Sequence, residues 1–343
     1  MQNITMAVDL AKSVFEVAVS ERPGTVSERH RLSRRKFLDF LVQRKPAVVL
    51  LEACGSAHFW GRKAAELGHQ PVLLPPREVR RYVRRNKTDR ADAKALLEAH
   101  RNEEILPVPV KSVPQQSLMA LHRFRSGWMA ARTGQLNSIR GLLREFGILI
   151  PLGARQVVPH VEQLIEDAES DVPMALRAAL AGACSQVREL EDSIRSVEKE
   201  LQQLARQTPL VAQLQTIPGI GILTATALVA FVGDIRRFPS ARHFASYLGL
   251  TPSERSSAYR RRLGKISKRG DVYLRMLLTH GARAVLHHAK RTETPDRLRA
   301  WATRVERFRG HNKATMALAN KLARIVWAVW TKGQTYQSIA PAA

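Results

Sequence analysis

The first third of the chain alternates between short apolar runs and segments with helical spacing of apolar residues. Runs rich in Val, Ile, Thr and Phe, bounded by turn residues, are typical of β-strands. The pattern predicts strands over 4–10, 14–20, 25–32, 47–52 and 71–74. It predicts helices over 35–43 and 57–67. Three strands followed by alternating helix and strand indicate an α/β domain with a mixed sheet.

The middle of the chain has the spacing of long helices. Pro107, Pro109 and Pro114 mark a break after the strand-rich region. Apolar spacing then predicts a helix over 115–147. A later stretch carries a seam with alternating spacings of three and four, namely Val187, Leu190, Ile194, Val197, Leu201 and Leu204. So short a heptad seam fits a hairpin with the first helix and a pairing with a second chain equally well.

Charge and composition limit the classes of molecule that the protein is expected to bind. Lys and Arg total 55 against 30 Asp and Glu, so the formal net charge is +25. Such a surplus indicates a polyanion, with nucleic acid as the first candidate. The two cysteines, Cys54 and Cys184, have no metal-site spacing and fit a reducing compartment. Without a signal-peptide pattern or an apolar run of membrane-spanning length, we expect a cytoplasmic, nucleoid-associated protein without a membrane partner.

Four acidic residues stand where a metal site could form. Asp9 and Glu52 each end an apolar strand, and Asp89 and Asp92 are three residues apart at the start of a helical stretch. If the first and fourth strands are neighbours, their carboxylates lie at one level, and a helix can cross over them. Residues at i and i+3 share one helix face. Such an oxygen-rich site suits paired divalent metals, which carry out phosphoryl transfer.

Basic residues precede and interleave the paired aspartates. They are Arg80, Arg81, Arg84, Arg85, Lys87 and Arg90. A cationic segment leading into an acidic metal site is expected when the substrate is a phosphate backbone. A solvated helix face is the simpler interpretation, but Glu78 is the only acid interleaved before Asp89.

Two features of the last third also point to phosphates. Gly219 and Gly221 form a glycine-rich turn before a helix, where free backbone N–H groups suit sequence-independent phosphate contact. Further on, Ser257 lies in a segment rich in hydroxyl and basic side chains. Its cations are Arg255, Arg260, Arg261, Arg262, Lys265, Lys268, Arg269 and Arg275. From chemistry alone, such a hydroxyl can bind a phosphate or attack it, with the guanidinium groups stabilising the developing charge.

The four acids resemble the metal site of ribonuclease-H-like nucleases, and specifically the Asp-Glu-Asp-Asp pattern of Holliday-junction resolvases. Taken with the Ile217–Gly221 turn and the block from Gly249 through Ser257 to Arg275, the whole chain resembles a DEDD-type insertion-sequence transposase. This group is guided by a bridge RNA. The resemblance extends over roughly residues 4–336.

The resemblance implies a recombinase with two cooperating parts. The four acids correspond to the metal-binding tetrad, which would hold two ions of Mg²⁺ or Mn²⁺, and Ser257 falls at the nucleophilic serine. Donor DNA, target DNA and a non-coding bridge RNA are the implied partners. A homo-oligomer, a dimer assembling to a tetramer, would form composite sites in which the metals of one subunit face the serine of another.

The same resemblance sets the expected architecture. We expect an α/β ribonuclease-H-like (RuvC-like) domain over 1–106 and a helical linker with a coiled coil over 107–208. A mainly α-helical transposase domain carrying the serine would follow over 209–336, with a tail over 337–343.

One departure from the family pattern concerns the serine. In the family, glycine typically follows it, whereas here Ala258 does. A left-handed backbone at alanine would cost ~1 kcal/mol or more. Ser256 is the adjacent alternative, and we choose Ser257 on its distance from Pro252. Two other functions remain open: a junction endonuclease that uses metal and water, and a non-catalytic nucleic-acid-binding protein.

Overall fold

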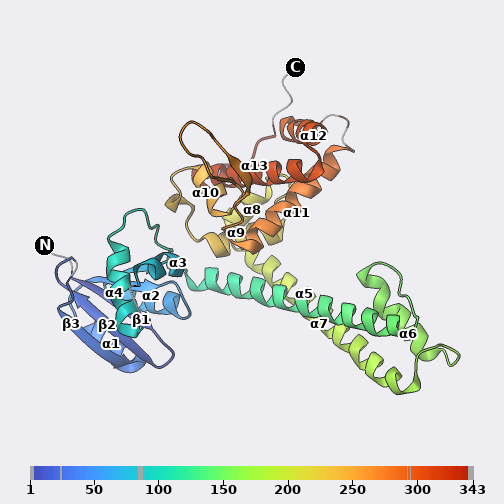
Figure 1. Cartoon of the computed structure of the whole chain (residues 1–343), viewed down its shortest axis with the longest axis horizontal. Helices are drawn as coiled ribbons and strands as arrows, with labels where there is room; N and C mark the ends of the chain where they lie inside the picture. The colour runs from blue at the N-terminus through green and yellow to red at the C-terminus, as the bar shows by residue number, and fades with distance from the viewer. Residues whose placement is uncertain (1–3, 24, 84–87, 292, 294, 339–343) are drawn as a thin grey trace. The chain divides into compact units, whose positions relative to one another are not determined.

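The computed structural model describes residues 4–23, 25–83, 88–291, 293 and 295–338 (Figure 1). The chain divides into two compact units, Met1–Gln115 and Gln116–Ala343. The predicted segments 107–208 and 209–336 therefore fall mostly within the second unit. Most of the predicted tail, residues 339–343, lies outside the described residues.

A five-stranded mixed sheet forms the centre of the first unit. Its strands are β1 (Thr5–Leu10), β2 (Val14–Ser20), β3 (Glu28–Ser33), β4 (Val48–Glu52) and β5 (Gln70–Leu74). They lie in the order β3-β2-β1-β4-β5. The first three strands are antiparallel neighbours, whereas β4 runs parallel to both β1 and β5. The predicted mixed sheet is confirmed, and so is the pairing of the first strand with the fourth.

Helices cover both faces of this sheet. Alternate residues of β1 point to opposite faces, so Met6 and Val8 join the core beneath α1 (Arg34–Gln43) and α2 (Ala57–Glu66). Ala7 joins the other core, beneath α4 (Asp89–His100). The short helices α3 (Pro76–Val79) and η1 (Arg80–Tyr82) follow β5.

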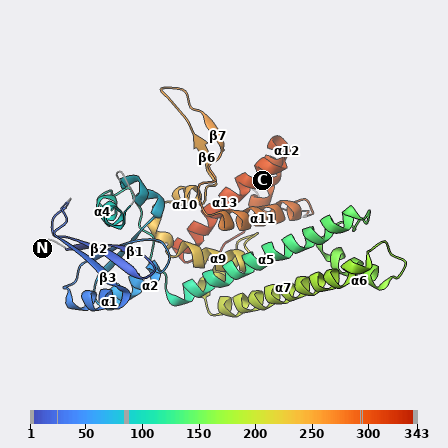
Figure 2. The ribbon, with the colours of Figure 1, turned by 60° about the horizontal axis from the view of Figure 1, so that its bottom comes forward.

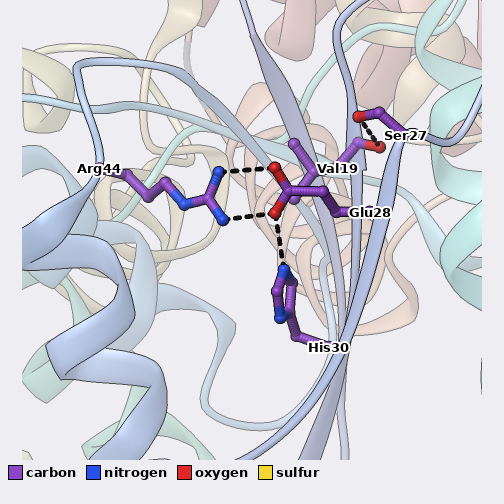
Figure 3. A network of polar contacts seen from close by, with 5 residues as sticks. All are labelled: Val19, Ser27, Glu28, His30 and Arg44. Carbon is purple, nitrogen blue, oxygen red and sulfur yellow. Dashed lines mark hydrogen bonds and ion pairs between the residues drawn. The ribbon is translucent and has the colours of Figure 1, made fainter.

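An ion-pair network fastens the edge strand β3 to the end of α1 (Figure 3). Arg44, the C-cap of α1, donates two hydrogen bonds to the carboxylate of Glu28, at 3.1 and 2.5 Å. His30 Nε2 lies 2.8 Å from the same carboxylate. These bonds, that from Arg44 first, lower the pKa of Glu28 to about 2.

A long helical hairpin opens the second unit. It consists of α5 (Val113–Glu145) and α7 (Met174–Arg206), which run side by side with η2 (Ala154–Gln156) and α6 (Val157–Glu166) at its end (Figure 2). Arg125 and Arg132 of α5 pair with Glu198 and Glu191 of α7, both at 2.7 Å. Val187, Ile194, Val197 and Leu201 of the predicted seam are buried. Of the two arrangements that the seam allowed, the structure has the hairpin within one chain.

The rest of the second unit is mostly helical, as the sequence predicted. Its helices are α8 (Pro209–Gln215), α9 (Ile222–Val232), η3 (Ile235–Arg237), α10 (Ala241–Tyr247), α11 (Val272–Ala289), α12 (Arg297–Arg309) and α13 (His311–Lys332). A two-stranded hairpin, β6 (Pro252–Glu254) and β7 (Leu263–Ile266), lies between α10 and α11. No helix in the described ranges is long and apolar enough to cross a membrane.

A buried polar contact joins three of these helices. The ring of His122 on α5 is fully buried, with Nδ1 3.0 Å from the Tyr273 hydroxyl on α11. Its Nε2 lies 3.0 Å from the Thr226 hydroxyl on α9. Burial, and secondarily the charge of Arg125, lowers the pKa of His122 to about 4, so the ring is neutral at pH 7.

Candidate metal and nucleic-acid site

The pairing of β1 with β4 brings two of the predicted acids to one level. Val8 lies opposite Leu51 in this parallel pair, so Asp9 and Glu52 are the next residues along each strand. Asp9 is two residues after Ala7, and Glu52 is two residues after Leu50, so each acid is on the same face of its strand as a residue of the core under α4. Strand alternation therefore turns both carboxylates toward α4. The arrangement expected for these two residues is thus present.

Helix α4 supplies the third acid. Thr88 caps its N-terminus by accepting a hydrogen bond from the backbone N–H of Ala91 at 3.2 Å. Asp92 lies one turn before Leu96 and two turns before Ala99, both of which are buried against the sheet. Asp89 is the first residue of α4, but its side chain lies outside the described part of the structure.

The three described acids line one cavity of about 650 Å³, here called the acidic cavity. Partial burial raises the pKa of the Cys54 thiol, and the nearby Glu52 and Asp9 carboxylates raise it further. The donor set suits Mg²⁺ or Mn²⁺, which prefer carboxylate oxygen. Among the described side chains, which exclude that of Asp89, no three acids, histidines or cysteines are placed to hold one ion.

The basic residues near the acidic cavity divide into several groups. Arg77 and Arg80 line it beside the carboxylates. Arg81 pairs instead with Glu78 at 2.6 Å, while Arg90 lies 3.7 Å from Glu16 on β2. The remaining predicted cations of this stretch, Arg84, Arg85 and Lys87, lie outside the described residues.

Ser257 lies at the tip of the β6–β7 hairpin, where a loop was expected. Its backbone N–H donates to the Arg260 carbonyl at 3.3 Å, and the Arg260 N–H donates back at 3.1 Å. These bonds close a two-residue turn in which Ala258 has φ +49°. Alanine thus has a left-handed backbone at the position where glycine was expected from the resemblance. Tyr259 beside it is fully exposed.

The two adjacent serines differ in their contacts. The Ser256 hydroxyl donates to Glu254 at 2.7 Å and accepts from the Arg262 backbone N–H at 3.1 Å. Ser257 is exposed, and its hydroxyl has no hydrogen-bond partner in the described chain. The hydroxyl of Ser256 therefore stabilises the turn, whereas the hydroxyl of Ser257 is exposed to solvent and accessible to a substrate.

The cations around this hairpin are not equivalent. Arg275 is half-buried and donates to the carbonyls of Leu248 and Gly270 at 3.0 and 3.3 Å, so it braces the hairpin base. Arg261 pairs with Glu254 at 3.2 Å. The others are exposed, namely Arg255, Arg260, Arg262, Lys265, Lys268 and Arg269. Exposed positive charge therefore extends along the hairpin, with Arg255, Arg260 and Arg262 nearest in sequence to Ser257.

The two glycines of the predicted phosphate turn serve different ends. Gly219 has φ +81°, and a Cβ there would lie 2.6 Å from the backbone carbonyl oxygen of Gly281 on α11. Close helix packing thus explains this glycine without a ligand. Gly221 is exposed and precedes the first turn of α9, so its predicted phosphate contact remains sterically possible.

Sequence reasoning missed Glu16. This residue lies directly opposite Asp9 in the antiparallel pair of β1 and β2, and it is only 8% exposed. Cross-strand partners point to the same face, so Glu16 is a fifth carboxylate on the α4 side of the sheet. The available signal was a single charge between the apolar residues Phe15 and Val17 in a predicted strand.

Comparisons with known proteins bear on both parts of the site. A family model of DEDD transposases of the IS110 group, described as "Transposase", matches residues 6–148. A second model, described as "Transposase IS116/IS110/IS902 family", matches residues 211–301. The matched ranges contain the four acids and Ser257, respectively.

Several curated proteins are similar along nearly the whole chain. A "Probable family 20 transposase" of Pseudomonas aeruginosa is 39% identical, over 97% of this chain and 98% of its own length. The "Transposase for insertion sequence element IS1111A" of Coxiella burnetii is 35% identical, over 97% and 91%. The "Transposase for insertion sequence element IS1328" of Yersinia enterocolitica is 35% identical, over 98% and 99%.

Proposed function

The chain belongs to the IS110 family of insertion-sequence transposases, and from that premise we propose that it cuts and rejoins DNA with a serine nucleophile and carboxylate-bound divalent ions. The nucleophile is Ser257. The proposed metal ligands are Asp9, Glu52, Asp89 and Asp92. The observation that carries the proposal is the acidic cavity, in which three of these four acids, distant in sequence, line one space beneath α4.

Each residue has a definite part in the proposed reaction. The Ser257 Oγ attacks the scissile phosphorus and forms an O–P bond, while the bond to the deoxyribose oxygen breaks. The serine proton is lost, and the departing oxygen gains one. A hydroxyl of the second strand then attacks the phosphoserine, which restores a phosphodiester and the free serine. The exposed cations of the hairpin stabilise charge on the phosphate.

The acidic cavity has the complementary part. Mg²⁺ or Mn²⁺ held there would supply positive charge for the reacting phosphate oxygens. The carboxylates hold and orient those ions, and Arg77 and Arg80 at the cavity wall draw the DNA backbone toward them. From the family resemblance we further propose that a bridge RNA pairs with donor and target DNA, and that the serine and the metals of one site come from different subunits.

Two serine variants test the nucleophile within the same hairpin. The gene would be expressed within its own flanking DNA, and excision would be scored by amplification across the circular junction. Ser257→Ala should abolish junctions because the attacking oxygen is removed. Ser256→Ala, the matched control, should retain most of the activity because its hydroxyl only braces the turn. Junctions that persist in Ser257→Ala would favour the endonuclease that uses water.

The acids are tested in the same assay. Asp9→Asn and Asp92→Asn should abolish excision because each removes a charged ligand while nearly preserving its shape. Asp39→Asn on the exposed surface of α1 is the control, and it should leave excision unchanged. Full activity in both cavity variants would favour a non-catalytic nucleic-acid-binding protein.

A further inference from the structure

A second cavity lies on the same face of the sheet as the acidic cavity. It has a volume of about 320 Å³ and is lined by Glu16, Arg29, His30, Arg31, Thr88 and Arg90. We call it the arginine pocket. Two of its arginines, Arg29 and Arg31, come from the edge strand β3, in which no site was predicted.

Strand register connects the arginine pocket to the acidic cavity. Asp9 on β1 lies opposite Glu16 on β2, and Glu16 lies opposite Arg31 on β3. These residues form one row across the sheet, with all side chains on the α4 face. Neighbouring strands are about 4.8 Å apart, so Arg31 lies about 10 Å from the strand of Asp9. The first turns of α4 line both cavities, with Asp92 in one and Arg90 in the other.

The contacts within the arginine pocket organise its positive charge. Arg29 donates to the backbone carbonyl of Arg90 at 3.4 Å, and the Arg90 guanidinium lies 3.7 Å from the buried Glu16 carboxylate. Arg31 has no ion-pair partner within the described ranges. Among the described side chains that line this pocket, three guanidinium groups therefore accompany one carboxylate. Glu16 offsets part of this charge and positions Arg90, and the remainder favours an anion.

We propose that the arginine pocket holds a backbone phosphate of the DNA strand whose reacting phosphate lies at the acidic cavity. One guanidinium group can donate hydrogen bonds to two oxygens of the same phosphate, which gives both affinity and orientation. The pocket offsets the repulsion that a carboxylate-lined cavity exerts on DNA. It thereby fixes the direction in which the strand leaves the site, across β2 toward β3. This inference rests on the proposed function for the identity of the strand.

Salt-dependent binding of full-length protein to labelled oligothymidylate tests the arginine pocket. The titration is run in EDTA, so that no divalent metal contributes to binding. Each lost phosphate contact should reduce the slope of log K against log salt by about 0.7 for a single strand. We expect a reduction of about 0.7 for the Arg29→Ala/Arg31→Ala double variant, because both side chains contact the same phosphate, and a smaller reduction for Arg31→Ala alone. Arg31→Lys should keep the slope.

The matched control removes the same charge from the opposite face of the sheet. Arg35 is exposed on α1, and Arg35→Ala should leave the slope unchanged. An equal reduction in this variant would mean a general charge effect and would refute the arginine pocket. A reduction with oligouridylate but not with oligothymidylate would assign the pocket to RNA and overturn the inference.

Replacing single phosphates of the DNA by uncharged methylphosphonates locates the phosphate that the arginine pocket contacts. A single methylphosphonate is moved along the DNA, and its effect on affinity is measured for the wild type and for the double variant. One position should weaken binding by the wild type but have no effect on the variant. If every position weakens both proteins equally, no phosphate lies in the arginine pocket. Since the excision assay tests the serine and the acids separately, failure here would leave the proposed chemistry untouched. Failure of the chemistry would leave the phosphate contact intact and remove only the identity of the strand.

Discussion

Replacing Ala258 by glycine should stabilise the tip of the serine hairpin. Ala258 has φ +49°, and the left-handed backbone costs an L-residue about 1–2 kcal/mol. Glycine has no such penalty, but it loses about 0.5–1 kcal/mol more conformational entropy on ordering. The difference leaves a gain of about 1 kcal/mol for the closed turn, which is about fivefold in its closing equilibrium.

Hydrogen exchange of the peptide covering residues 252–266 measures this effect directly. The backbone N–H groups of Ser257 and Arg260 bond across the turn, so their exchange in Ala258→Gly should slow about fivefold. The control is Ala181→Gly at an exposed position inside α7. Glycine in a helix interior costs about 1 kcal/mol, so exchange around residue 181 should become faster. Unchanged or faster exchange at the hairpin tip would refute the strain argument.

The effect of Ala258→Gly on function can be measured in the excision assay. If the closed turn is the state that presents Ser257, excision should rise by no more than the same factor of about five. A fall in excision would show that the reactive tip needs an open or different turn. In either case Ser257→Ala in the glycine background should remain inactive.

Three further predictions concern the folded state. Between pH 6.5 and 4, His122 becomes protonated in the unfolded chain but not in the folded one. The free energy of unfolding should therefore fall by about 3 kcal/mol over this range. In His122→Gln the free energy of unfolding should depend less steeply on pH, and an equally steep dependence would contradict the assignment. Gly281→Ala should lower the melting temperature strongly, because the added Cβ would lie 2.1 Å from the carbonyl oxygen of Gly219; an unchanged value would mean that the two backbones separate freely. Glu28→Gln should cost about 1 kcal/mol at pH 7 because the partly exposed pair with Arg44 is screened. That loss should vanish as the pH falls from about 4.5 toward 2, where the wild-type carboxylate is protonated too; a difference that persists there would refute the charge argument.

The sheet and its acids could be predicted because the pattern was strong. Apolar runs ended in Asp9 and Glu52, and their strands proved to be neighbours with matching register. The helical stretch that was expected to start around Asp89 is α4, which begins at that residue and is capped by Thr88. Strand order was the decisive step: a mixed sheet allows the first and fourth strands to be neighbours without requiring it, and the structure has them so.

The remaining features depend on contacts that a one-dimensional pattern does not contain. The β6–β7 hairpin has short strands containing Pro252 and Gly264, residues with low strand propensity, so it was expected to be a loop. Gly219 was assigned to phosphate because close helix packing and ligand approach both require a missing side chain. Predicting the arginine pocket would have required the register between β2 and β3. The alternating pattern of β3, with its exposed arginines, does not specify that register.

The projecting position of Ser257 has a consequence for control. Ser257 is five positions beyond Pro252, which at about 3.3 Å per position amounts to an arm of about 17 Å. At its end the hydroxyl has no described partner to accept its proton, and an unassisted serine is a weak nucleophile. On the proposed function, an isolated copy is therefore dormant until another molecule docks against the tip. The rate of cutting would then rise more steeply than in proportion to the number of copies in the cell. Scarcity of the protein would itself protect the host chromosome.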